Sequence, residues 1–318
     1  MKILVTGGAG YIGSHLVLKL CDLGYEVRVL DNLSLGDKRS VDSRAKFVEG
    51  SISDKNILSK ALDCVNVVIH LAAFKSAGES MINPEKYSKN NILGTQILLD
   101  TMIEHEIKNI IFSSTAAVYG NPQYLPIDEN HPKNPSNYYG FTKLHIEKTL
   151  EWYKNLLGLN YVVLRYFNAA GYDLSGKLNI PEKNPANLIP VIMEVASGSR
   201  EKVTVFGDDY NTIDGTGVRD YIHVTDLVNA HVNALELVQN GQSDTINLGS
   251  SSQFSVLEVI KSAEKITGRE IPFEIVDRRE GDPPTVHASC DYAKKVLNWS
   301  ASQSNIENII ETTWRICK

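Results

Sequence analysis

A tyrosine and a lysine four residues apart form the first pattern in this sequence that could do chemistry. Tyr139 and Lys143 stand in a Y-x-x-x-K run near the start of a predicted helix, so their side chains share one helix face. A free tyrosine has a pKa of about 10, and a nearby cation favours the phenolate. Lowering this pKa to about 7 corresponds to roughly 4 kcal/mol and makes the phenol a general base. The pair therefore predicts proton transfer at a substrate hydroxyl.

Hydroxyl side chains after a neighbouring apolar run are candidates to assist this tyrosine. Residues 110–112 lead into Ser113, Ser114 and Thr115. Open α/β sheets bind ligands beyond the carboxyl ends of their strands, so one of these hydroxyls is expected to hydrogen-bond the substrate oxygen and share its proton with Tyr139. The residues alone leave open which hydroxyl it is, because the others would only cap the end of the strand.

A glycine-rich turn near the N-terminus predicts a dinucleotide site. Gly7, Gly10 and Gly13 have the spacing G-x-x-G-x-x-G between a short apolar run and a helical pattern. Glycines there let the backbone turn sharply and approach a pyrophosphate, while the helix N-terminus offers N–H groups to the phosphates. Asp31 follows the second apolar run and would accept hydrogen bonds from the adenosine ribose, which predicts NAD rather than NADP. The alternative is that Asp31 only caps a turn.

Short apolar runs alternate with helical patterns through the first half of the chain. The runs are apolar throughout, as expected of strands buried on both faces of a sheet. The expected strands are 2–5, 27–30, 47–48, 65–69, 110–112 and 162–166, and the expected helices are 14–23, 54–62, 87–104 and 139–157. This alternation predicts a Rossmann-type, doubly wound α/β fold with a parallel sheet and right-handed crossovers.

The second half of the chain predicts a smaller α/β domain. Residues 171–187 and 207–220 are polar and rich in glycine, asparagine, aspartate or proline, and are expected to be loops. The expected helices are 188–196, 225–238, 256–267 and 306–314, and the expected strands are 203–206, 245–248 and 273–276. We expect an NAD-binding domain at 1–168, with segments near 218–250 returning to it. A substrate domain is expected at 169–318, across a cleft.

Composition limits the partners and the compartment of the protein. The chain has 318 residues, 42 % of them hydrophobic, and a net charge of −6, which argues against binding of nucleic acid or of an anionic membrane. No two of the four cysteines form a C-x-x-C pair and no metal-ligand spacing occurs, so neither a disulfide framework nor a metal site is expected. No apolar run is long enough for a signal peptide or a membrane span. A cytoplasmic protein is expected.

Longer motifs resemble a known family. Residues 6–14 (TGGAGYIGS), 113–120 (SSTAAVYG), the Y-x-x-x-K pair and 165–171 (RYFNAAG) resemble the extended short-chain dehydrogenase/reductase family. Residues 214–224 (DGTGVRDYIHV), 71–80 (LAAFKSAGES) and 278–282 (RREGD) are similar to the UDP-glucose 4-epimerases within it. The resemblance covers nearly the whole chain.

The resemblance implies a role for many residues. The implied catalytic residues are Tyr139 as base and acid, Lys143, which tunes it and holds the nicotinamide ribose, and Thr115 as the hydroxyl partner. The implied NAD contacts, beside these and the glycine turn, are Tyr11, Ile12, Asp31, Asn32, Ser51, Ile52, Leu71, Ala72, Ala73, Lys75, Asn90 and Phe167. The implied UDP-sugar contacts are Thr115, Asn168, Asn187, Leu188, Phe206, Arg219, Arg279, Asp282 and Val286. A guanidinium fork suits a diphosphate, although Arg219 and Arg279 could instead pair with Asp220 and Glu280.

The mechanism implied by the resemblance is transient oxidation at sugar C4, rotation of the keto sugar and return of the hydride to its other face. The resemblance also implies a homodimer packed through residues 87–104 and 139–157. Ser51 stands where relatives have an aspartate, which predicts weaker retention of NAD. Val286 is smaller than the tyrosine that excludes N-acetyl sugars, so conversion of UDP-GlcNAc and UDP-GalNAc is also expected.

Other functions on the same fold are less well supported by the residues. A 4,6-dehydratase needs an acidic pair after the threonine, where this chain has Ala116 and Ala117. A 4-epimerase of UDP-glucuronate or of a UDP-pentose is a closer alternative. A non-catalytic NAD-binding regulator would be expected to lack the tyrosine or the lysine, and fold alone does not decide the matter.

Overall fold

The chain forms two compact units in the computed structural model, which describes residues 1–182, 185, 187–279 and 281–318. Unit 1 comprises Met1–Gly120, Lys133–Arg165 and Val228–Ile246, and unit 2 comprises Asn121–Pro132, Tyr166–Leu227 and Asn247–Lys318. The expected boundary after residue 168 lies close to the end of the second segment of unit 1. The sequence gives no sign that Asn121–Pro132 packs with unit 2. None of the described helices is long and apolar enough to cross a membrane.

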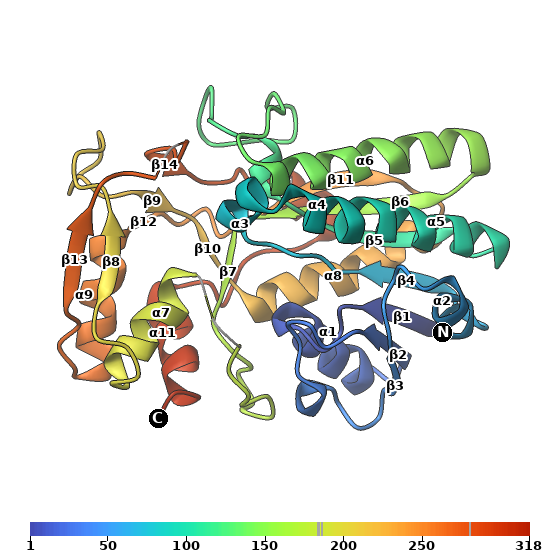
Figure 1. Cartoon of the computed structure of the whole chain (residues 1–318), viewed down its shortest axis with the longest axis horizontal. Helices are drawn as coiled ribbons and strands as arrows, with labels where there is room; N and C mark the ends of the chain where they lie inside the picture. The colour runs from blue at the N-terminus through green and yellow to red at the C-terminus, as the bar shows by residue number, and fades with distance from the viewer. Residues whose placement is uncertain (183–184, 186, 280) are drawn as a thin grey trace. The chain divides into compact units, whose positions relative to one another are not determined.

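A seven-stranded sheet forms the centre of unit 1, in the order β11-β6-β5-β4-β1-β2-β3 (Figure 1). Its strands are β1 (Lys2–Thr6), β2 (Glu26–Asp31), β3 (Lys46–Glu49), β4 (Val67–His70), β5 (Asn109–Thr115), β6 (Asn160–Tyr166) and β11 (Asp244–Leu248). The pairs from β3 to β5 run parallel, and the strand order reverses between β1 and β4. This is the doubly wound arrangement expected from the sequence, and such sheets bind ligands beside the reversal point.

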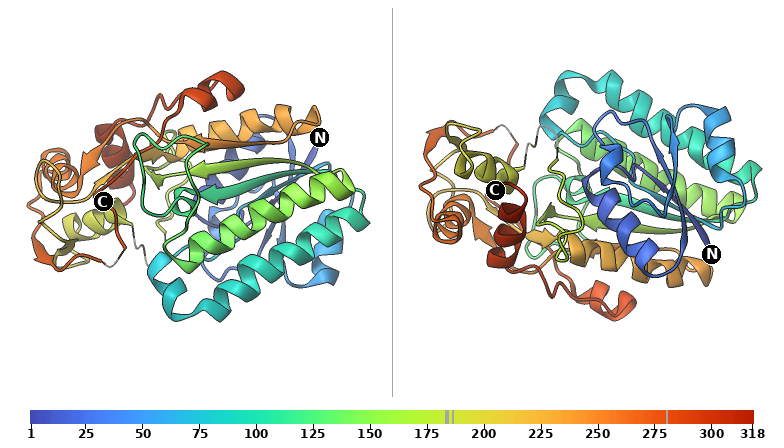
Figure 2. Two further views of the ribbon diagram at one scale, coloured as in Figure 1. Left: turned by 90° about the horizontal axis from the view of Figure 1, so that it is seen from above. Right: turned by 90° about the horizontal axis from the view of Figure 1, so that it is seen from below.

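Helices cover both faces of this sheet. On one face, α2 (Lys55–Leu62), α5 (Thr95–Glu104) and α6 (Tyr138–Leu157) bury leucines and isoleucines against strand residues such as Leu4 and Ile110. In Figure 2, α5 and α6 lie side by side on this face, where Gln96 hydrogen-bonds Tyr153. On the other face lie α1 (Tyr11–Asp22) and α8 (Val224–Gln239) (Figure 1).

Two of the expected elements differ from the structure in an informative way. The expected helix at 87–104 is a short helix α4 (Pro84–Tyr87), a wide π-helical segment η2 (Ser88–Gly94) and α5. A helix α3 (Ala77–Ile82), which the sequence did not predict, precedes them. Strand β5 continues past its apolar run through Ser113 to Thr115, because hydroxyl side chains also fit a strand.

The described residues of unit 2 form short strands and four further helices. Its strand pairs are β7 (Asn168–Ala170) with β10 (Tyr221–His223), β8 (Val203–Phe206) with β13 (Phe273–Val276), and β9 (Val218–Arg219) with both β12 (Phe254–Ser255) and β14 (Thr285–Val286). Its helices are α7 (Leu188–Ala196), α9 (Val256–Thr267), α10 (Asp291–Leu297) and α11 (Ile306–Arg315). The apolar sides of α7, α9 and α11 form its core with β8.

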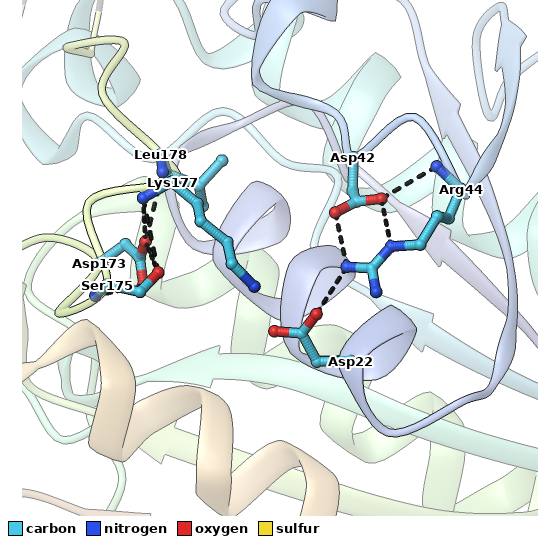
Figure 3. A network of polar contacts seen from close by, with 7 residues as sticks. All are labelled: Asp22, Asp42, Arg44, Asp173, Ser175, Lys177 and Leu178. Carbon is cyan, nitrogen blue, oxygen red and sulfur yellow. Dashed lines mark hydrogen bonds and ion pairs between the residues drawn. The ribbon is translucent and has the colours of Figure 1, made fainter.

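Aspartate side chains stabilise two of the loops through hydrogen bonds and ion pairs (Figure 3). In unit 1, Arg44 donates to Asp42 and to Asp22 at the end of α1, at 2.8 and 2.6 Å, and so ties the loop after β2 to that helix. In unit 2, Asp173 Oδ2 accepts the Ser175 hydroxyl at 2.6 Å and the Lys177 amide at 2.7 Å. This turn lies within the expected loop 171–187, of which residues 183, 184 and 186 lie outside the described part.

Candidate functional site

The N-terminal end of α6 brings the tyrosine of the Y-x-x-x-K pair to the end of β5. Asn137 caps α6 by accepting the Gly140 amide at 2.9 Å. A Cβ on Gly140 would lie 2.5 Å from the Ala117 carbonyl oxygen, so only glycine lets α6 approach the turn η3 (Ala116–Val118) this closely. The sequence analysis did not identify Gly140 as a functional residue, although it lies next to Tyr139.

Thr115 is the hydroxyl that meets the tyrosine. Its hydroxyl lies near enough to the Tyr139 phenol to lower the pKa of that group, and its Oγ1 accepts the Ala117 amide at 3.1 Å. Ser113 and Ser114 are bonded elsewhere. Successive residues of a strand point to opposite faces, so Ser113 Oγ reaches His231 of α8 at 2.9 Å, while Ser114 Oγ donates to a carboxylate of α6 at 2.5 Å.

Lys143 is buried beneath the tyrosine. It is 5 % exposed, and its Nζ donates to the Ser113 carbonyl at 2.8 Å and lies 4.7 Å from the Phe112 ring centroid. Burial lowers the pKa of Lys143 to about 7, because a charged ammonium loses its hydration there.

The pKa of Tyr139 in the structure is shifted in the direction opposite to the one expected from the nearby lysine. Burial raises the pKa of Tyr139 to about 12, and the hydrogen bond from Thr115 acts in the opposite direction without offsetting it. The physical reason is that a phenolate loses hydration on burial, while the ammonium of Lys143 is itself disfavoured and directed to the Ser113 carbonyl. Positive charge favours a phenolate, so a cationic group bound beside Tyr139 would act against the effect of burial.

Two further residues, which the sequence analysis missed, hold the loop after β4 against α6. Ser80 Oγ accepts the Tyr139 amide at 3.0 Å. Asn91, which is 3 % exposed, bonds both the amide and the carbonyl of Phe74 at 3.0 Å and donates to Thr142 at 3.3 Å. Asn91 lies in the π-helical segment η2, and such segments frequently occur at functional sites. Two adjacent asparagines in the sequence were the only signal for it.

The glycine turn packs as closely as its sequence predicts. Gly7 has φ +74°, and a Cβ there would lie 2.7 Å from the Ala72 nitrogen. A Cβ on Gly13 would lie 2.1 Å from the Gly7 carbonyl oxygen. Gly10 is the N-cap of α1 and has no side chain, so none of the described side chains caps this helix. An uncapped helix N-terminus and a glycine backbone are the donor set that suits a pyrophosphate.

Asp31 lies at the end of β2 and braces this turn. Its Oδ2 accepts the Ala9 amide at 3.0 Å and its Oδ1 accepts the Leu33 amide at 2.8 Å. Each carboxylate oxygen can accept a second hydrogen bond, so the group can also bind ribose hydroxyls. The residues present therefore fit the adenosine and pyrophosphate parts of NAD.

The other expected cofactor residues divide between the units. Tyr11 and Ile12 begin α1, and Ser51 and Ile52 precede α2, where Ser51 Oγ accepts the Ser53 amide at 3.1 Å. Phe167 belongs to unit 2, next to Asn168. The remaining expected residues of unit 1 lie after β2, after β4 and in η2: Asn32, Leu71, Ala72, Ala73, Lys75 and Asn90.

Within unit 2, the short strands gather several of the expected substrate residues. Val286 of β14 is the register partner of Arg219 in β9. Arg219 Nη2 donates to Asp282 Oδ1 at 2.5 Å. The Arg279 guanidinium lies 3.7 Å from the ring centroid of Phe206, at the end of β8.

The alternative pairing of Arg219 with Asp220 is wrong. Asp220 is fully buried, and its Oδ1 accepts the amide and the hydroxyl of Ser250, both at 2.7 Å. Glu280 lies outside the described residues.

The remaining expected substrate residues of unit 2 lie at the starts of elements. Asn168 begins β7 and donates its side-chain amide to the Asp220 carbonyl at 2.9 Å. Asn187 is the N-cap of α7, and Leu188 is the first residue of that helix.

The Tyr210 hydroxyl, close to the charges of Arg219 and Asp282, is buried without a hydrogen-bond partner among the described residues. The sequence analysis did not single out Tyr210.

Within the described part of the chain, no group of three histidine, cysteine, aspartate or glutamate residues could hold a metal ion. All four cysteines are free thiols.

Comparison with known proteins connects this geometry to a family. Residues 3–249 match the model of the NAD dependent epimerase/dehydratase family. The chain belongs to this family. The family depends on NAD, which is therefore the cofactor of the chain, in agreement with the fit of the glycine turn and Asp31.

Individual relatives cover almost the full length. The UDP-glucose 4-epimerase of Halalkalibacterium halodurans is 48 % identical over 317 residues, covering 99 % of this chain and 95 % of the relative. A crystal structure of UDP-glucose 4-epimerase from Brucella ovis in complex with NAD is 43 % identical, with a TM-score of 0.95 over 99 % of this chain and 97 % of that chain. The structure from Bifidobacterium longum in complex with NAD+ and UDP is 38 % identical, with a TM-score of 0.94 over 99 % and 98 %.

Proposed function

We propose that the chain is an NAD-dependent isomerase that interconverts UDP-glucose and UDP-galactose by inverting the configuration at sugar C4. The observation that carries the proposal is the placement of the Thr115 hydroxyl near Tyr139 at the end of β5, with Lys143 buried one helical turn further along α6 and bonded to the Ser113 carbonyl. The relatives named UDP-glucose 4-epimerase, similar along the whole chain, support the choice of substrate.

The chain's own residues handle the proton in this reaction. Tyr139 removes the proton of the 4-hydroxyl and later returns it to the 4-keto oxygen, while Thr115 donates a hydrogen bond that stabilises the phenolate. NAD, when bound, supplies the hydride acceptor and donor and a positively charged ring. Lys143 adds positive charge and a donor for the nicotinamide ribose. No oxidant is consumed, so the net reaction is an isomerisation.

The cofactor contacts in this proposal follow the fit of unit 1. The N-terminus of α1 and the turn from Gly7 to Gly13 hold the pyrophosphate, and Asp31 accepts the adenosine ribose hydroxyls. Ser51 accepts from the adenine amino group without a charge. Its hydroxyl already accepts the Ser53 amide, which supports weaker retention of NAD than an aspartate would give.

The substrate contacts in this proposal come from unit 2. Arg219 and Arg279 bind the diphosphate through their guanidinium groups, and Phe206 stacks on uracil. Val286 leaves room at sugar C2, so we also propose activity on UDP-GlcNAc and UDP-GalNAc. The support for this extension is the small side chain of Val286, which lies in β14 beside Arg219, one of the proposed diphosphate ligands.

Incubation of the purified protein with UDP-galactose tests the proposal, with product separated by chromatography. With NAD added, UDP-glucose should form without net consumption of the cofactor, and Tyr139→Phe should abolish its formation while the variant still binds NAD. UDP-glucuronate and a UDP-pentose complete the panel. Conversion of one of these alone would assign the chain to a different sugar, and conversion of none would contradict the proposal.

We further propose that the protein acts as a homodimer in the cytoplasm, without a nucleic-acid or membrane partner. The outward sides of η2 and α6 carry exposed apolar side chains, with Leu93 53 %, Phe141 46 %, Trp152 64 % and Leu156 72 % exposed. Apolar residues gathered on neighbouring helices favour a protein interface. The four free thiols support a reducing compartment. Light scattering of the parent and of Trp152→Glu tests the dimer, since the variant should be monomeric.

A further inference from the structure

Helix α6 contacts three successive residues at the end of β5. Tyr139, Lys143 and Glu147 are spaced four residues apart and share one face of α6. Tyr139 meets the Thr115 side chain, and Lys143 Nζ donates to the Ser113 carbonyl at 2.8 Å. Ser114, which lies between Ser113 and Thr115 in β5, is also bound to α6, because its Oγ donates to Glu147 Oε1 at 2.5 Å. The end of β5 is thus fixed to α6 one residue before the hydroxyl that meets Tyr139.

Glu147 is itself held rigidly by a buried ion pair. Arg165 of β6 donates through Nε to Glu147 Oε1 at 2.9 Å and through Nη2 to Oε2 at 2.5 Å. The two side chains are 3 % and 4 % exposed, and Arg165 Nη1 also donates to Tyr119 Oη at 2.9 Å. A bidentate pair of this kind fixes the orientation of the carboxylate. Because burying two charges is costly, such a pair is weak evidence for stability and is better explained by a need for geometry.

We propose that Glu147 is a positioning residue for the epimerisation, which holds the end of β5 through Ser114 and places a carboxylate one helical turn from the Lys143 ammonium. This inference rests on the proposed function. Glu147 does not touch the reacting atoms and acts only through its two neighbours. The motif of the active site in this chain accordingly extends one helical turn further, to Y-x-x-x-K-x-x-x-E, and includes Arg165 as the partner that fixes the carboxylate.

The electrostatic part of this role follows from the groups around Lys143. On α6 these are Tyr139 and Glu147, on β4 His70, and beyond the Ser113 hydroxyl on α8 His231. Burial lowers the pKa of Lys143 to about 7, and Glu147 acts in the opposite direction. His70 is neutral because burial lowers its pKa to about 3, so it does not stabilise or replace the ammonium. Glu147 is the carboxylate that favours the charged form of Lys143.

Two variants of the full-length protein separate this role from general stability. Glu147→Gln keeps the size of the side chain but leaves Arg165 buried without a counter-charge, which endangers folding. The double variant Glu147→Met, Arg165→Met removes both charges, and apolar replacement of a buried pair is generally tolerated. Circular dichroism and the melting temperature show which variants are folded. Glu151→Gln is the matched control, because its ion pair with Lys148 lies on the exposed side of the same helix.

The first measurement is the conversion of UDP-galactose by folded variants. A misplaced Tyr139–Thr115 pair should lower kcat about ten- to hundredfold, with KM unchanged within about twofold. Glu151→Gln should retain the parental kcat. A folded double variant with parental kcat would overturn the proposal.

The second measurement does not depend on catalysis. The protein is labelled with 13C at the lysine ε-carbon, and the signal of Lys143 is assigned by its loss in Lys143→Met. In the double variant its titration midpoint should move to lower pH than in the parent, and in Glu151→Gln it should stay. An unchanged midpoint in the folded double variant overturns the inference, whatever the rate. A parent without activity on UDP-galactose would contradict the proposed function instead, and the titration would still decide the role of Glu147.

Discussion

The hydroxyl of Thr115 lies near the Tyr139 phenol at the end of β5, and it alone, among the described groups that affect Tyr139, lowers the pKa of the phenol. Burial dominates and raises that pKa to about 12. The Thr115 hydroxyl is therefore placed to donate to the phenolate, and a cation bound nearby would favour the phenolate further.

Replacement of Thr115 by valine should slow the reaction without unfolding the protein. Valine keeps the shape of threonine, but it can neither donate to Tyr139 nor accept the Ala117 amide. Loss of one hydrogen-bond donor to a developing charge costs about 10²- to 10³-fold in kcat. Thr115→Ser retains the hydroxyl and should stay within about tenfold of the parent. Steady-state kinetics with UDP-galactose make the comparison, and equal rates for Val and Ser would remove Thr115 from the mechanism.

Gly140→Ala should damage both stability and activity. The new Cβ would lie 2.5 Å from the Ala117 carbonyl oxygen, a backbone atom, so α6 must move away from η3 and carry Tyr139 with it. Overpacking of this kind costs about 1–3 kcal/mol.

Gly78→Ala is the control for this change, because its Cβ would meet nothing within 4 Å and it lies in the short helix α3. There alanine should be neutral or stabilising by about 0.4–1 kcal/mol. Urea unfolding of both variants checks the contrast. A Gly140→Ala protein as stable and active as the parent would show that the close approach is not needed.

His70 should make the protein sensitive to acid. The two ring nitrogens of His70 form hydrogen bonds with the Thr6 hydroxyl at 2.6 Å and with the Thr95 hydroxyl at 2.8 Å. Burial lowers the pKa of His70 to about 3. Between the ordinary pKa of about 6.5 and about 3, the unfolded chain binds the proton and the folded chain does not. Stability should therefore fall as the pH drops through this range, by up to about 1.4 kcal/mol per pH unit from this group.

The measurement for His70 is the unfolding free energy from pH 7 to 4, compared between the parent and His70→Asn. The variant should be less stable at pH 7, because it loses hydrogen bonds, but its stability should fall less steeply with acid. Parallel curves would mean that His70 titrates normally in the folded protein.

Val286→Tyr should abolish any conversion of UDP-GlcNAc and UDP-GalNAc while sparing UDP-galactose. The larger side chain fills the space that an N-acetyl group would need at sugar C2, whereas a hydroxyl requires little room. Val286 pairs through its backbone with Arg219, so the strand register survives the change. Competition between the two substrates measures the ratio of kcat/KM. An equal loss on both substrates would show that position 286 does not select the sugar.

Sequence reasoning predicted the sheet and the site partners that lie close in the chain. The alternation of apolar runs and helical patterns is local, and so are the spacings of Gly7 to Gly13 and of Tyr139 to Lys143. Which of Ser113, Ser114 and Thr115 faces Tyr139 could not be predicted from nearby residues. The answer depends on contacts with α8 and α6, which lie far along the chain.

The pairing of very short strands could also not be predicted from the sequence. β9 and β14 contain two residues each, too few for any periodicity, yet their register brings Val286 beside Arg219. The effect of burial on the pKa of Tyr139 could not be predicted from the sequence, for a different reason. The spacing of the tyrosine and lysine shows that a cation is near, but not how much hydration the phenol loses.

The carboxylate of Asp31 has a consequence for any attempt to change the cofactor. Because Asp31 also accepts the Ala9 and Leu33 amides, removing it to admit a phosphorylated ribose would leave two backbone donors unsatisfied beside the glycine turn. A switch of coenzyme thus demands at least one compensating exchange nearby that replaces these acceptors. Natural relatives that use a cofactor with a phosphorylated ribose are expected to differ from this chain in the loop after β2 as well as at Asp31.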